Sequence, residues 1–301
     1  NSLTVSNIYN GNGSLAREVF TNGNVSLQTV DYTWDPQNRL AGITYQDQSQ
    51  PSFLPQLSLN TVGYAYDDFG NRIRKAISAP GGSNIYYINN GLSVLNELNS
   101  AGVVQKTLVQ GLGQIAEIDA AGVITFMHTD VLGSTVLVTD YAGAVVQEYE
   151  YDPFGGTVGA DGSYDTNYLF TGQEFDPESN LYYYNARYYN PNTGRFISRD
   201  VMVGRDGDVV SKNRYVYVRN NPLKWVDPSG EEDITADFIY KLKSSAAVAQ
   251  TLGDPRDIFA GPWLSNKKVV GKLKELLSNL PDADFSKLMA NDKVWNELQA
   301  T

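Results

Sequence analysis

Residues 64–77, YAYDDFGNRIRKAI, carry the pattern that decides the fold of this 301-residue chain. Two tyrosines alternate with a small residue, an Asp-rich turn ending in Gly-Asn follows, and a second stretch, RIRKAI, follows the turn. Alternation interrupted by Asp, Asn and Gly predicts two antiparallel strands joined by a tight turn. The turn aspartate can accept backbone N–H groups, and the glycine can adopt a positive φ. We expect a β-hairpin here.

The same pattern recurs on both sides of this hairpin. Residues 32–45, YTWDPQNRLAGITY, and 149–160, YEYDPFGGTVGA, repeat the aromatic–X–aromatic–Asp phrase. Three more turns have the form Asn or Asp, any residue, Ala, Gly, at 99–102, 119–122 and 140–143. A strand–turn–strand unit repeated about every 20 residues indicates a solenoid or a coiled sheet. The predicted fold is mainly β, with repetitive antiparallel hairpins forming a curved sheet or partial shell over residues 1–165.

Composition excludes several classes of function. A net charge of −11 argues against a nucleic-acid-binding surface, which would be basic. The absence of cysteine excludes disulfides and thiolate metal sites, and a single histidine makes no metal site, so no metal or cofactor is expected. No apolar run approaches the ~20 residues that span a bilayer. The first residues, NSLTVSNIYN, lack a signal peptide and a starting Met, and the repeat begins in mid-phrase. We expect a piece of a longer chain, with a processed protein as the alternative.

The single histidine lies in FMHTDVLGSTVLVTD, residues 126–140. His128, Asp130 and Ser134 are candidates for nucleophilic catalysis by residue type alone. Ser134 lacks the nucleophile-elbow pattern, however, so a structural polar cluster at a hairpin is the favoured interpretation.

The most aromatic part of the sequence, residues 168–230, precedes an abrupt change of pattern. Its tyrosines suit a β-surface with apolar faces and hydroxyl edges, so we expect them to pack rather than to bind sugars or bases. Arg187 and Arg195 are expected to pair with turn carboxylates. After Gly230 the spacing becomes helical, with an i, i+4 stripe from Ile234 to Ala246 and a second helix over 269–280. Residues 231–301 are therefore predicted to be a small α-helical segment, without the motifs of an independent enzyme such as a nuclease.

These motifs resemble the Rhs (rearrangement hotspot) or YD-repeat family over residues 1 to about 230. The tyrosine–aspartate phrases carry the resemblance, and FTGQEFDPESNLYYYNARYYNPNTGRFISRD with NRYVYVRNNPLKWVDPSG is similar to its Rhs-associated core domain. The resemblance implies three parts: a YD-repeat sheet or shell over 1–165, a core domain over 166–230 that plugs the shell, and an effector or toxin-like segment over 231–301. It also implies a secreted or cell-surface bacterial protein. The implied partners are the remainder of the shell, an immunity protein and a secretion-system component.

The resemblance further implies a site. Self-cleaving members of the family cut their own chain after an Asp–Pro–X–Gly motif with paired aspartates. The matching positions are Asp200 in ISRD and Asp227 in VDPSG, which places the cut between Gly230 and Glu231. Two close carboxylates cannot both ionise easily, so that one acts as a general acid and the other activates water. Arg199 is expected to keep Asp200 ionised as the base.

Two departures from the family pattern keep a second interpretation open. Asp200 is followed by Val-Met rather than an Asp–Pro-like motif, and residues 231–233 are Glu-Glu-Asp where cleaving members often have Leu. The alternative is a non-catalytic structural or cell-surface interaction scaffold, in which both aspartates only form turns.

Overall fold

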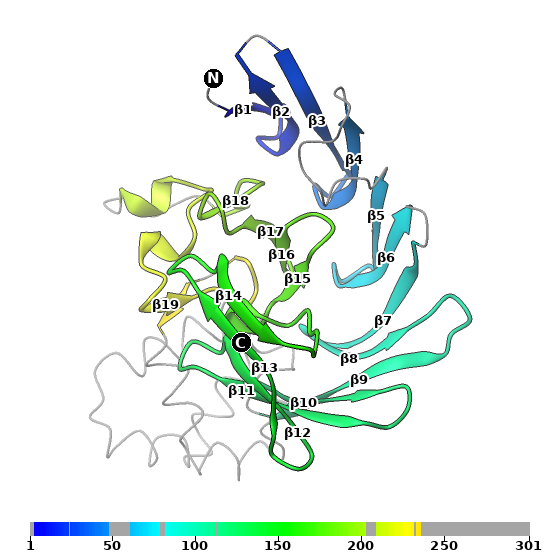
Figure 1. Cartoon of the computed structure of the whole chain (residues 1–301). Coiled ribbons are helices and arrows are strands. Elements are labelled where there is room, and N and C mark those ends of the chain that lie inside the picture. The colour runs from blue at the N-terminus through cyan, green and yellow to red at the C-terminus, as the bar shows by residue number, and fades with distance from the viewer. Residues whose placement is uncertain are drawn as a thin grey trace, which may run out of the picture.

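Fourteen strands form one antiparallel sheet in which each strand pairs with the next one in the sequence (Figure 1). The computed structural model describes residues 3–23, 25–47, 61–78, 82–111, 113–202, 209–231 and 233–235. The strands of this large sheet are β1 (Leu3–Tyr9), β2 (Leu15–Asn22), β3 (Val25–Trp34), β4 (Leu40–Asp47), β5 (Thr61–Tyr66), β6 (Arg72–Ser78), β7 (Asn84–Asn90), β8 (Ser93–Leu98), β9 (Val104–Gly111), β10 (Gly113–Asp119), β11 (Ile124–Thr129), β12 (Thr135–Asp140), β13 (Val145–Tyr151) and β14 (Thr157–Gly162). The prediction of a mainly-β chain of antiparallel hairpins is confirmed for the part of the chain that the structure describes.

Eight turns of the large sheet share one hydrogen-bonding scheme. The side-chain oxygen of the first turn residue accepts the backbone N–H groups two and four positions later, at 2.7–3.1 Å. The fourth residue has a positive φ, as at Gly70 (91°), and Asn38 (62°) takes this place in one turn. Short polar side chains that bond to their own backbone favour such turns. The first residues are Asn10, Asp35, Asp67, Asn99, Asp119, Asp130, Asp140 and Asp152.

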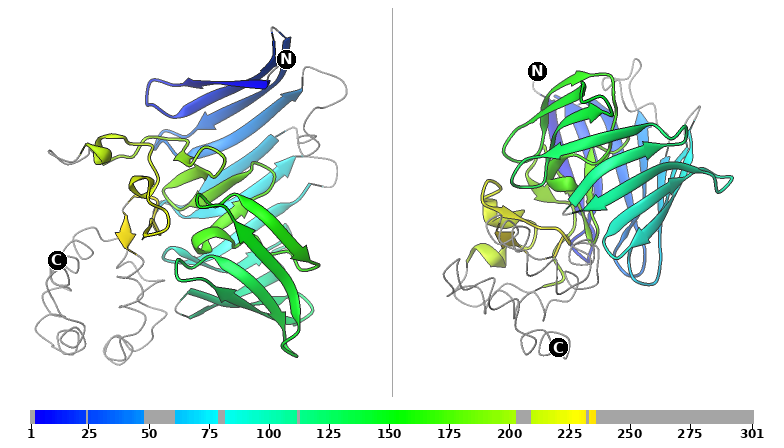
Figure 2. Two further views of the ribbon diagram at one scale, coloured as in Figure 1. Left: turned by 60° about the vertical axis from the view of Figure 1, so that its left-hand side comes forward. Right: turned by 90° about the horizontal axis from the view of Figure 1, so that it is seen from below.

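The large sheet curves because irregularities recur where its strands enter these turns. The pairing shifts between Ala65 and Tyr66 before the turn at Asp67, and between Glu150 and Tyr151 before the turn at Asp152. Similar shifts precede the turns at Asn10, Asp35, Asn99, Asp130 and Asp140. A β-bulge bends its strand and increases the local twist. Repetition of this feature accounts for the curved sheet seen in Figures 1 and 2.

The aromatic residue before the turn aspartate joins one hairpin to the next. In three hairpins its polar tip donates a 2.7 Å hydrogen bond to a backbone carbonyl on the neighbouring strand: Trp34 Nε1 to Leu15, Tyr66 Oη to Leu40, and Tyr151 Oη to Thr135. The tyrosines two positions earlier, Tyr32, Tyr64 and Tyr149, are buried. The aromatic–X–aromatic–Asp phrase thus combines a packing residue, a link between hairpins and a turn cap.

A second, four-stranded sheet lies inside the curve of the large sheet (Figure 2). This inner sheet consists of β15 (Glu174–Asp176), β16 (Leu181–Tyr184), β17 (Arg187–Asn190) and β18 (Arg195–Phe196). Tyr183 and Tyr188 face residues of β2 to β5, whereas Tyr182 and Tyr189 face residues of β11 to β13. Successive residues of a strand point to opposite faces, so a run of aromatic residues indicates that both faces are covered. The predicted packing role of these tyrosines is confirmed.

Short elements complete the described chain. They are the 3-10 turns η1 (Phe170–Gly172), η2 (Val210–Lys212) and η3 (Val218–Asn220), and a hairpin of β19 (Trp225–Val226) with β20 (Ile234–Thr235). Ile234 was expected in a helix but pairs with Val226, because the adjacent strand offers it backbone partners. The other predicted helices of the C-terminal segment lie outside the described residues. Within the described part, no helix is long and apolar enough to cross a membrane.

Candidate functional site

The guanidinium of Arg187 joins the two aspartates singled out in the sequence. Its Nη2 lies 3.0 Å from Asp200 Oδ2 and 3.3 Å from Asp227 Oδ2. Arg187 begins β17, Asp200 follows β18, and Asp227 directly follows β19, so three segments meet at one nitrogen. The side chain of Asp227 is 1% exposed and that of Asp200 is 17% exposed. One carboxylate is therefore fully enclosed, while the other keeps some access to solvent.

The orientation of Arg187 is set by its packing and by a backbone acceptor. Its Cζ lies 3.6 Å from the centroid of the Phe196 ring, which covers one face of the guanidinium. Its Nη1 donates to the Arg214 carbonyl at 3.3 Å. Arginine combines such stacking with donors in a fixed planar fork. The remaining N–H groups consequently point in defined directions.

The same two residues, Arg187 and Asp227, hold the peptide bond between Gly230 and Glu231. Arg187 Nε donates to the Gly230 carbonyl oxygen. The Glu231 amide N–H donates to Asp227 Oδ1 at 3.0 Å. Both polar atoms of this peptide group are thus bound by charged side chains. The bond that the family resemblance marks for cleavage is the one at the centre of the cluster.

The turn that carries this bond is seated on the loop between β16 and β17. The Ser229 carbonyl accepts the Ala186 N–H at 3.1 Å, and the Pro228 carbonyl accepts Asn185 Nδ2 at 2.9 Å. Gly230 has φ of 72°, and a Cβ there would lie 2.1 Å from the Tyr184 carbonyl oxygen. Only glycine fits this close approach without moving backbone.

Asp200 is fixed by its own turn and by Arg214. Its Oδ1 accepts the Met202 N–H at 2.7 Å, and its backbone N–H donates to the Arg214 carbonyl at 2.8 Å. Arg199 lies elsewhere: it is exposed, and its aliphatic carbons approach Gly13. Among the ion pairs of the described residues, Asp200 is joined to Arg187 and not to Arg199. The structure therefore brings together Asp200, Asp227, Gly230 and Glu231 and leaves Arg199 outside the cluster.

His128, Asp130 and Ser134 form no catalytic arrangement. His128 Nε2 lies 2.9 Å from Thr139 Oγ1, Asp130 caps its turn, and Ser134 Oγ accepts the Thr171 N–H at 3.1 Å. The expected structural polar cluster fits these bonds. Across the described residues, no group of three or more His, Cys, Asp or Glu side chains is arranged to hold a metal ion.

A sequence model of the teneurin YD-shell matches residues 55–223, which is more than half of the chain. The chain belongs to the YD-shell family, the Rhs/YD-repeat group. It is 34% identical over 214 residues to the tRNA3(Ser)-specific nuclease WapA of Bacillus spizizenii, a match that covers 69% of this chain and 9% of WapA. It is 27% identical over 229 residues to the toxin subunit YenC1 of Yersinia entomophaga, covering 66% of this chain and 22% of YenC1. This YD-shell chain thus spans a small part of the length of these curated relatives.

A solved structure shows the same fold. The crystal structure of TcdB2-TccC3-Cdc42 superposes with a TM-score of 0.52 at 20% sequence identity, over 76% of this chain and 13% of that one. At this identity the likeness concerns the YD-shell fold.

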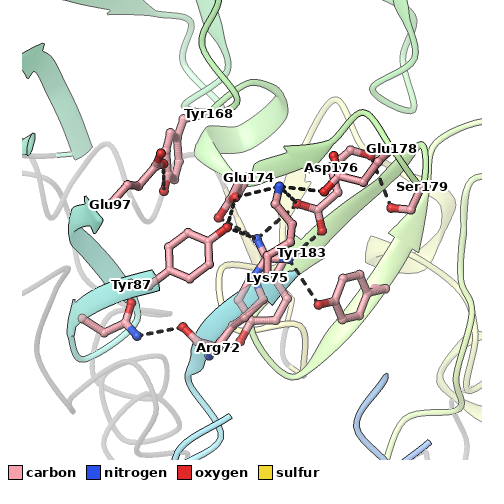
Figure 3. A network of polar contacts seen from close by, with 12 residues as sticks. Arg72, Lys75, Tyr87, Glu97, Tyr168, Glu174, Asp176, Glu178, Ser179 and Tyr183 are labelled. Atoms are coloured by element: carbon pink, nitrogen blue, oxygen red, sulfur yellow. Dashed lines mark hydrogen bonds and ion pairs between the residues drawn. The ribbon is translucent and has the colours of Figure 1, made fainter. Parts of the chain in front are cut away.

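A second charged cluster, which the sequence did not reveal, ties the YD-shell sheet to the inner sheet (Figure 3). Arg72 Nη1 lies 2.5 Å from Asp176 Oδ2, and Arg72 Nη2 lies 2.7 Å from Glu174 Oε2. Lys75 Nζ lies 2.8 Å from Asp176 Oδ1 and 2.9 Å from Glu178 Oε1. All five residues are buried, with both cations from β6 and the acids from β15 and the turn after it. A signal was present in the three acids of EFDPE, residues 174–178, and the cations of RIRK, residues 72–75.

Burial and charge act in opposite directions within this network. Burial disfavours the ionised form of Asp176, but Arg72 and Lys75 outweigh it and hold the pKa of Asp176 below its usual value. At the edge of the network, burial and then the charge of Glu174 raise the pKa of Glu97 to about 7. Tyr168 Oη donates to Glu97 Oε1 at 3.2 Å. Buried carboxyl groups inside the shell therefore differ in pKa: that of Asp176 is lowered and that of Glu97 is raised.

Proposed function

We propose that this chain is the C-terminal portion of a YD-shell protein that encloses or presents the segment after Gly230 and frees it by cutting its own backbone. In this proposal residues 1–165 belong to the shell, 166–230 form the plug with the cleavage site, and 231–301 are the effector segment. The observation that carries the proposal is the peptide bond between Gly230 and Glu231, which Arg187 and Asp227 hold, with Asp200 bound to the same Arg187 guanidinium. The names of two relatives, a nuclease and a toxin subunit, support an effector role for the freed segment.

We assign different roles to the two aspartates on the basis of their contacts and exposure. Asp227 Oδ1 lies 3.0 Å from the nitrogen that must leave and accepts its N–H. Once water has added to the Gly230 carbonyl carbon and this nitrogen has become pyramidal, a proton on Asp227 can pass to its lone pair as the C–N bond breaks. Asp200 is the more exposed of the two and can take a proton from an entering water molecule. The water oxygen bonds to the Gly230 carbonyl carbon, the C–N bond breaks, and the chain ends become a carboxyl group and an amine. Because the substrate belongs to the same chain, its positioning needs no separate binding step.

The first prediction concerns the length of the chain under denaturing conditions. The parent is expected to yield two pieces of roughly 25 and 8 kDa by proportion of length, the smaller beginning at Glu231. Asp227→Asn and Asp200→Asn, which keep side-chain shape but remove the titrating group, are expected to remain full length. Gel electrophoresis and amino-terminal sequencing are the measurements. Asp161→Asn, at an exposed aspartate of β14, is the matched control and should be cut like the parent.

A parent that stays in one piece at neutral and mildly acidic pH would disprove self-cleavage and support the second candidate. That candidate is a non-catalytic structural or cell-surface scaffold. The three acidic residues at 231–233 favour it, because they add negative charge beside a pair of carboxylates. In both proposals the partners include the rest of a larger shell or toxin complex, and the protein is secreted or lies at the cell surface. An immunity protein and a secretion-system component are further partners that belong to the first proposal.

A further inference from the structure

We infer that a cavity between the large sheet and the inner sheet is a binding site for a small primary ammonium ion, that is, a short aliphatic amine in its protonated form. The cavity has a volume of about 180 Å³. Drug-sized ligands occupy pockets of about 300–1,000 Å³, so a ligand of only a few heavy atoms suits this one. The site is independent of the proposed self-cleavage.

The cavity lies where turns of the large sheet meet the inner sheet. Asn71 precedes β6, Gly91 lies between β7 and β8, and Gly133 lies between β11 and β12. On the other side, Gln173 precedes β15 and Val226 ends β19. Apolar side chains that can contact an aliphatic chain also line the cavity: Leu92, Val94, Leu132 and Val226.

Six half-buried amide side chains line this cavity and are oriented alike. In each, the amide nitrogen donates a hydrogen bond of 2.8–3.3 Å to a carboxylate or to a backbone carbonyl of the protein. Within the described part of the chain none of the six amide oxygens accepts a hydrogen bond, and the oxygen of Gln114 is also buried. The six residues are Asn71, Asn89, Gln110, Gln114, Gln173 and Asn185.

This arrangement makes the cavity rich in acceptors that lack donors. An amide nitrogen that is already bonded to the protein leaves its oxygen as the group available to a ligand. A buried acceptor without a partner is unfavourable, so a ligand that brings donors is stabilised there. An ammonium group has three N–H donors and no acceptor, and it therefore complements these oxygens.

The charges behind the cavity favour a cation over a neutral donor. Among the described residues that line it, the charged ones are Arg72 and Glu174, which pair at 2.7 Å (Figure 3). The network that continues from this pair holds more carboxyl groups than cations. The carboxyl groups are those of Glu97, Glu117, Glu174, Asp176 and Glu178, and the cations are Arg72, Lys75 and Lys106. The network therefore carries an excess of negative charge when every carboxyl group is ionised.

Protons offset part of this excess when no ligand is bound. Burial and then the charge of Glu174 raise the pKa of Glu97 to about 7, and burial and then the charge of Asp176 raise the pKa of Glu178. A bound ammonium supplies positive charge in place of such a proton, so binding and the ionisation of Glu97 favour each other. The groups that face Glu97 are Glu174 of β15, Lys106 of β9, Glu117 of β10, Lys75 of β6, Tyr87 of β7 and Tyr168.

The test measures binding of three probes to the full chain by saturation-transfer NMR. Butylammonium is expected to bind with a Kd of about 1 mM, as suits a ligand of this size. Butanol has the same chain without the charge, and tetramethylammonium has the charge without N–H donors. Both are expected to bind at least about 10-fold more weakly. A parent that does not bind butylammonium, or that binds all three probes equally, would overturn the inference.

Two variants test the amide oxygens directly. Gln110 and Gln114 lie opposite each other on β9 and β10, and Gln110→Leu and Gln114→Leu each remove one acceptor. Each variant should bind butylammonium about 10-fold more weakly, because a hydrogen bond to a charged group is lost. Gln105→Leu, at an exposed glutamine of β9 outside the cavity lining, is the matched control and should keep the parental affinity. Circular dichroism establishes that each variant folds, and if one of the pair does not fold the other decides. Parental affinity in a folded variant of the pair would contradict the site.

The pH dependence of binding tests the role of the excess charge. Butylammonium stays protonated from about pH 6 to about pH 8, as a lysine side chain does, so a change in affinity over this range comes from the protein. The affinity of the parent should rise with pH as Glu97 loses its proton, and that of Glu97→Gln should stay constant. A parental affinity that does not change with pH would show that the ammonium and the network are not coupled, and would overturn the assignment of a cation to this cavity.

Discussion

Single side chains inside the YD shell couple its stability to pH in opposite directions. The pKa of Asp176 is held low by Arg72 and Lys75 against the effect of burial. The pKa of Glu97 is raised from 4.5 to about 7, first by burial and then by Glu174, while Lys106 opposes the rise. Folding therefore favours the charged form of Asp176 and the protonated form of Glu97.

The second prediction concerns the pH dependence of stability. The free energy of unfolding of the parent should fall as pH rises, and Glu97→Gln should lack this fall. Between 4.5 and about 7 the folded state holds the Glu97 proton and the unfolded state has lost it. The unfolded state binds fewer protons in this window, so the free energy of unfolding falls with pH, by about 1.4 kcal/mol for each unit of pKa difference. Urea unfolding from about pH 5 to about pH 8 should show the parent losing stability relative to Glu97→Gln.

The neighbours of Glu97 define the control for this experiment. Lys106, Glu117, Glu174 and Lys75 act on its charge, and Tyr168 donates a hydrogen bond to it. Glu97→Gln leaves these neighbouring residues unsubstituted and removes only the titrating group. Glu148→Gln, at an exposed position of β13, removes a carboxylate and leaves Glu97 and its neighbours unsubstituted. Glu148→Gln should run parallel to the parent at every pH. Parallel curves for Glu97→Gln and the parent would contradict the prediction.

At the scale of elements, the hairpin of β19 and β20 spans the candidate cut. Trp225 pairs with Thr235 and Val226 pairs with Ile234. The bond between Gly230 and Glu231 lies in the connection between these two strands. Breaking it opens the connection but leaves the backbone pairing of the strands in place.

The third prediction is that the two pieces of the cleaved chain stay together in native solution. They are expected to elute as one species from a size-exclusion column and to separate only in denaturant. Thr235→Pro, which fixes φ and removes a backbone donor, should shorten the time for which the small piece remains bound. Thr235→Val, which keeps the backbone donor, is the control. Immediate separation of the parental pieces on the native column would show that the hairpin does not retain them.

Local elements were accessible from the sequence because their causes are local. The turn at Asp67 needs only an aspartate, a glycine three positions later and flanking alternation, and all three can be read within ten residues. The contact between Arg72 and Asp176 joins residues 104 positions apart, and the charged stretches RIRK and EFDPE that supply them do not show that they pair. The strand at Ile234 was missed for a different reason: its partner Val226 is close in the sequence, but pairing with that strand outweighs the helical spacing of the residues that follow.

The candidate site shows the same division. Asp200, Asp227, Gly230 and Glu231 were located through motifs, and the structure places them in one cluster. The sequence pointed to Arg199 because it precedes Asp200, but its side chain is exposed and the ion pair of Asp200 is with Arg187. Adjacency in the sequence was therefore a poor guide to which arginine pairs with Asp200. The arginine that contacts both carboxylates is Arg187 of β17, for which the sequence predicts pairing with turn carboxylates but does not identify them.

For the whole molecule, the inner sheet links parts of the YD shell that the large sheet leaves far apart. Each strand of the large sheet pairs only with its sequence neighbours, so β4 and β12 share no ladder. One face of the inner sheet packs on β2 to β5, and the other packs on β11 to β13. Figure 1 shows the inner sheet between these two regions of the curve. We therefore expect the side-chain packing of β16 and β17 to couple the early strands to the late ones.

The fourth prediction uses two adjacent residues of β16 to test this coupling. Tyr183→Ala empties a site against β2 to β5, and Tyr182→Ala empties one against β11 to β13. Both residues are buried tyrosines with a 3.0 Å hydrogen bond to a backbone group, so each serves as the comparison for the other. Tyr183 also donates to the Gly70 carbonyl at 3.4 Å, and its ring centroid lies 4.4 Å from Arg72 Cζ. Loss of a buried aromatic side chain costs about 3–5 kcal/mol, and the loss should be felt first on the face that loses its packing. Backbone hydrogen exchange should accelerate mainly in β2 to β5 for Tyr183→Ala and mainly in β11 to β13 for Tyr182→Ala. The same uniform acceleration in both variants would mean that the shell opens as one unit and that the inner sheet does not act as a link between two separable halves.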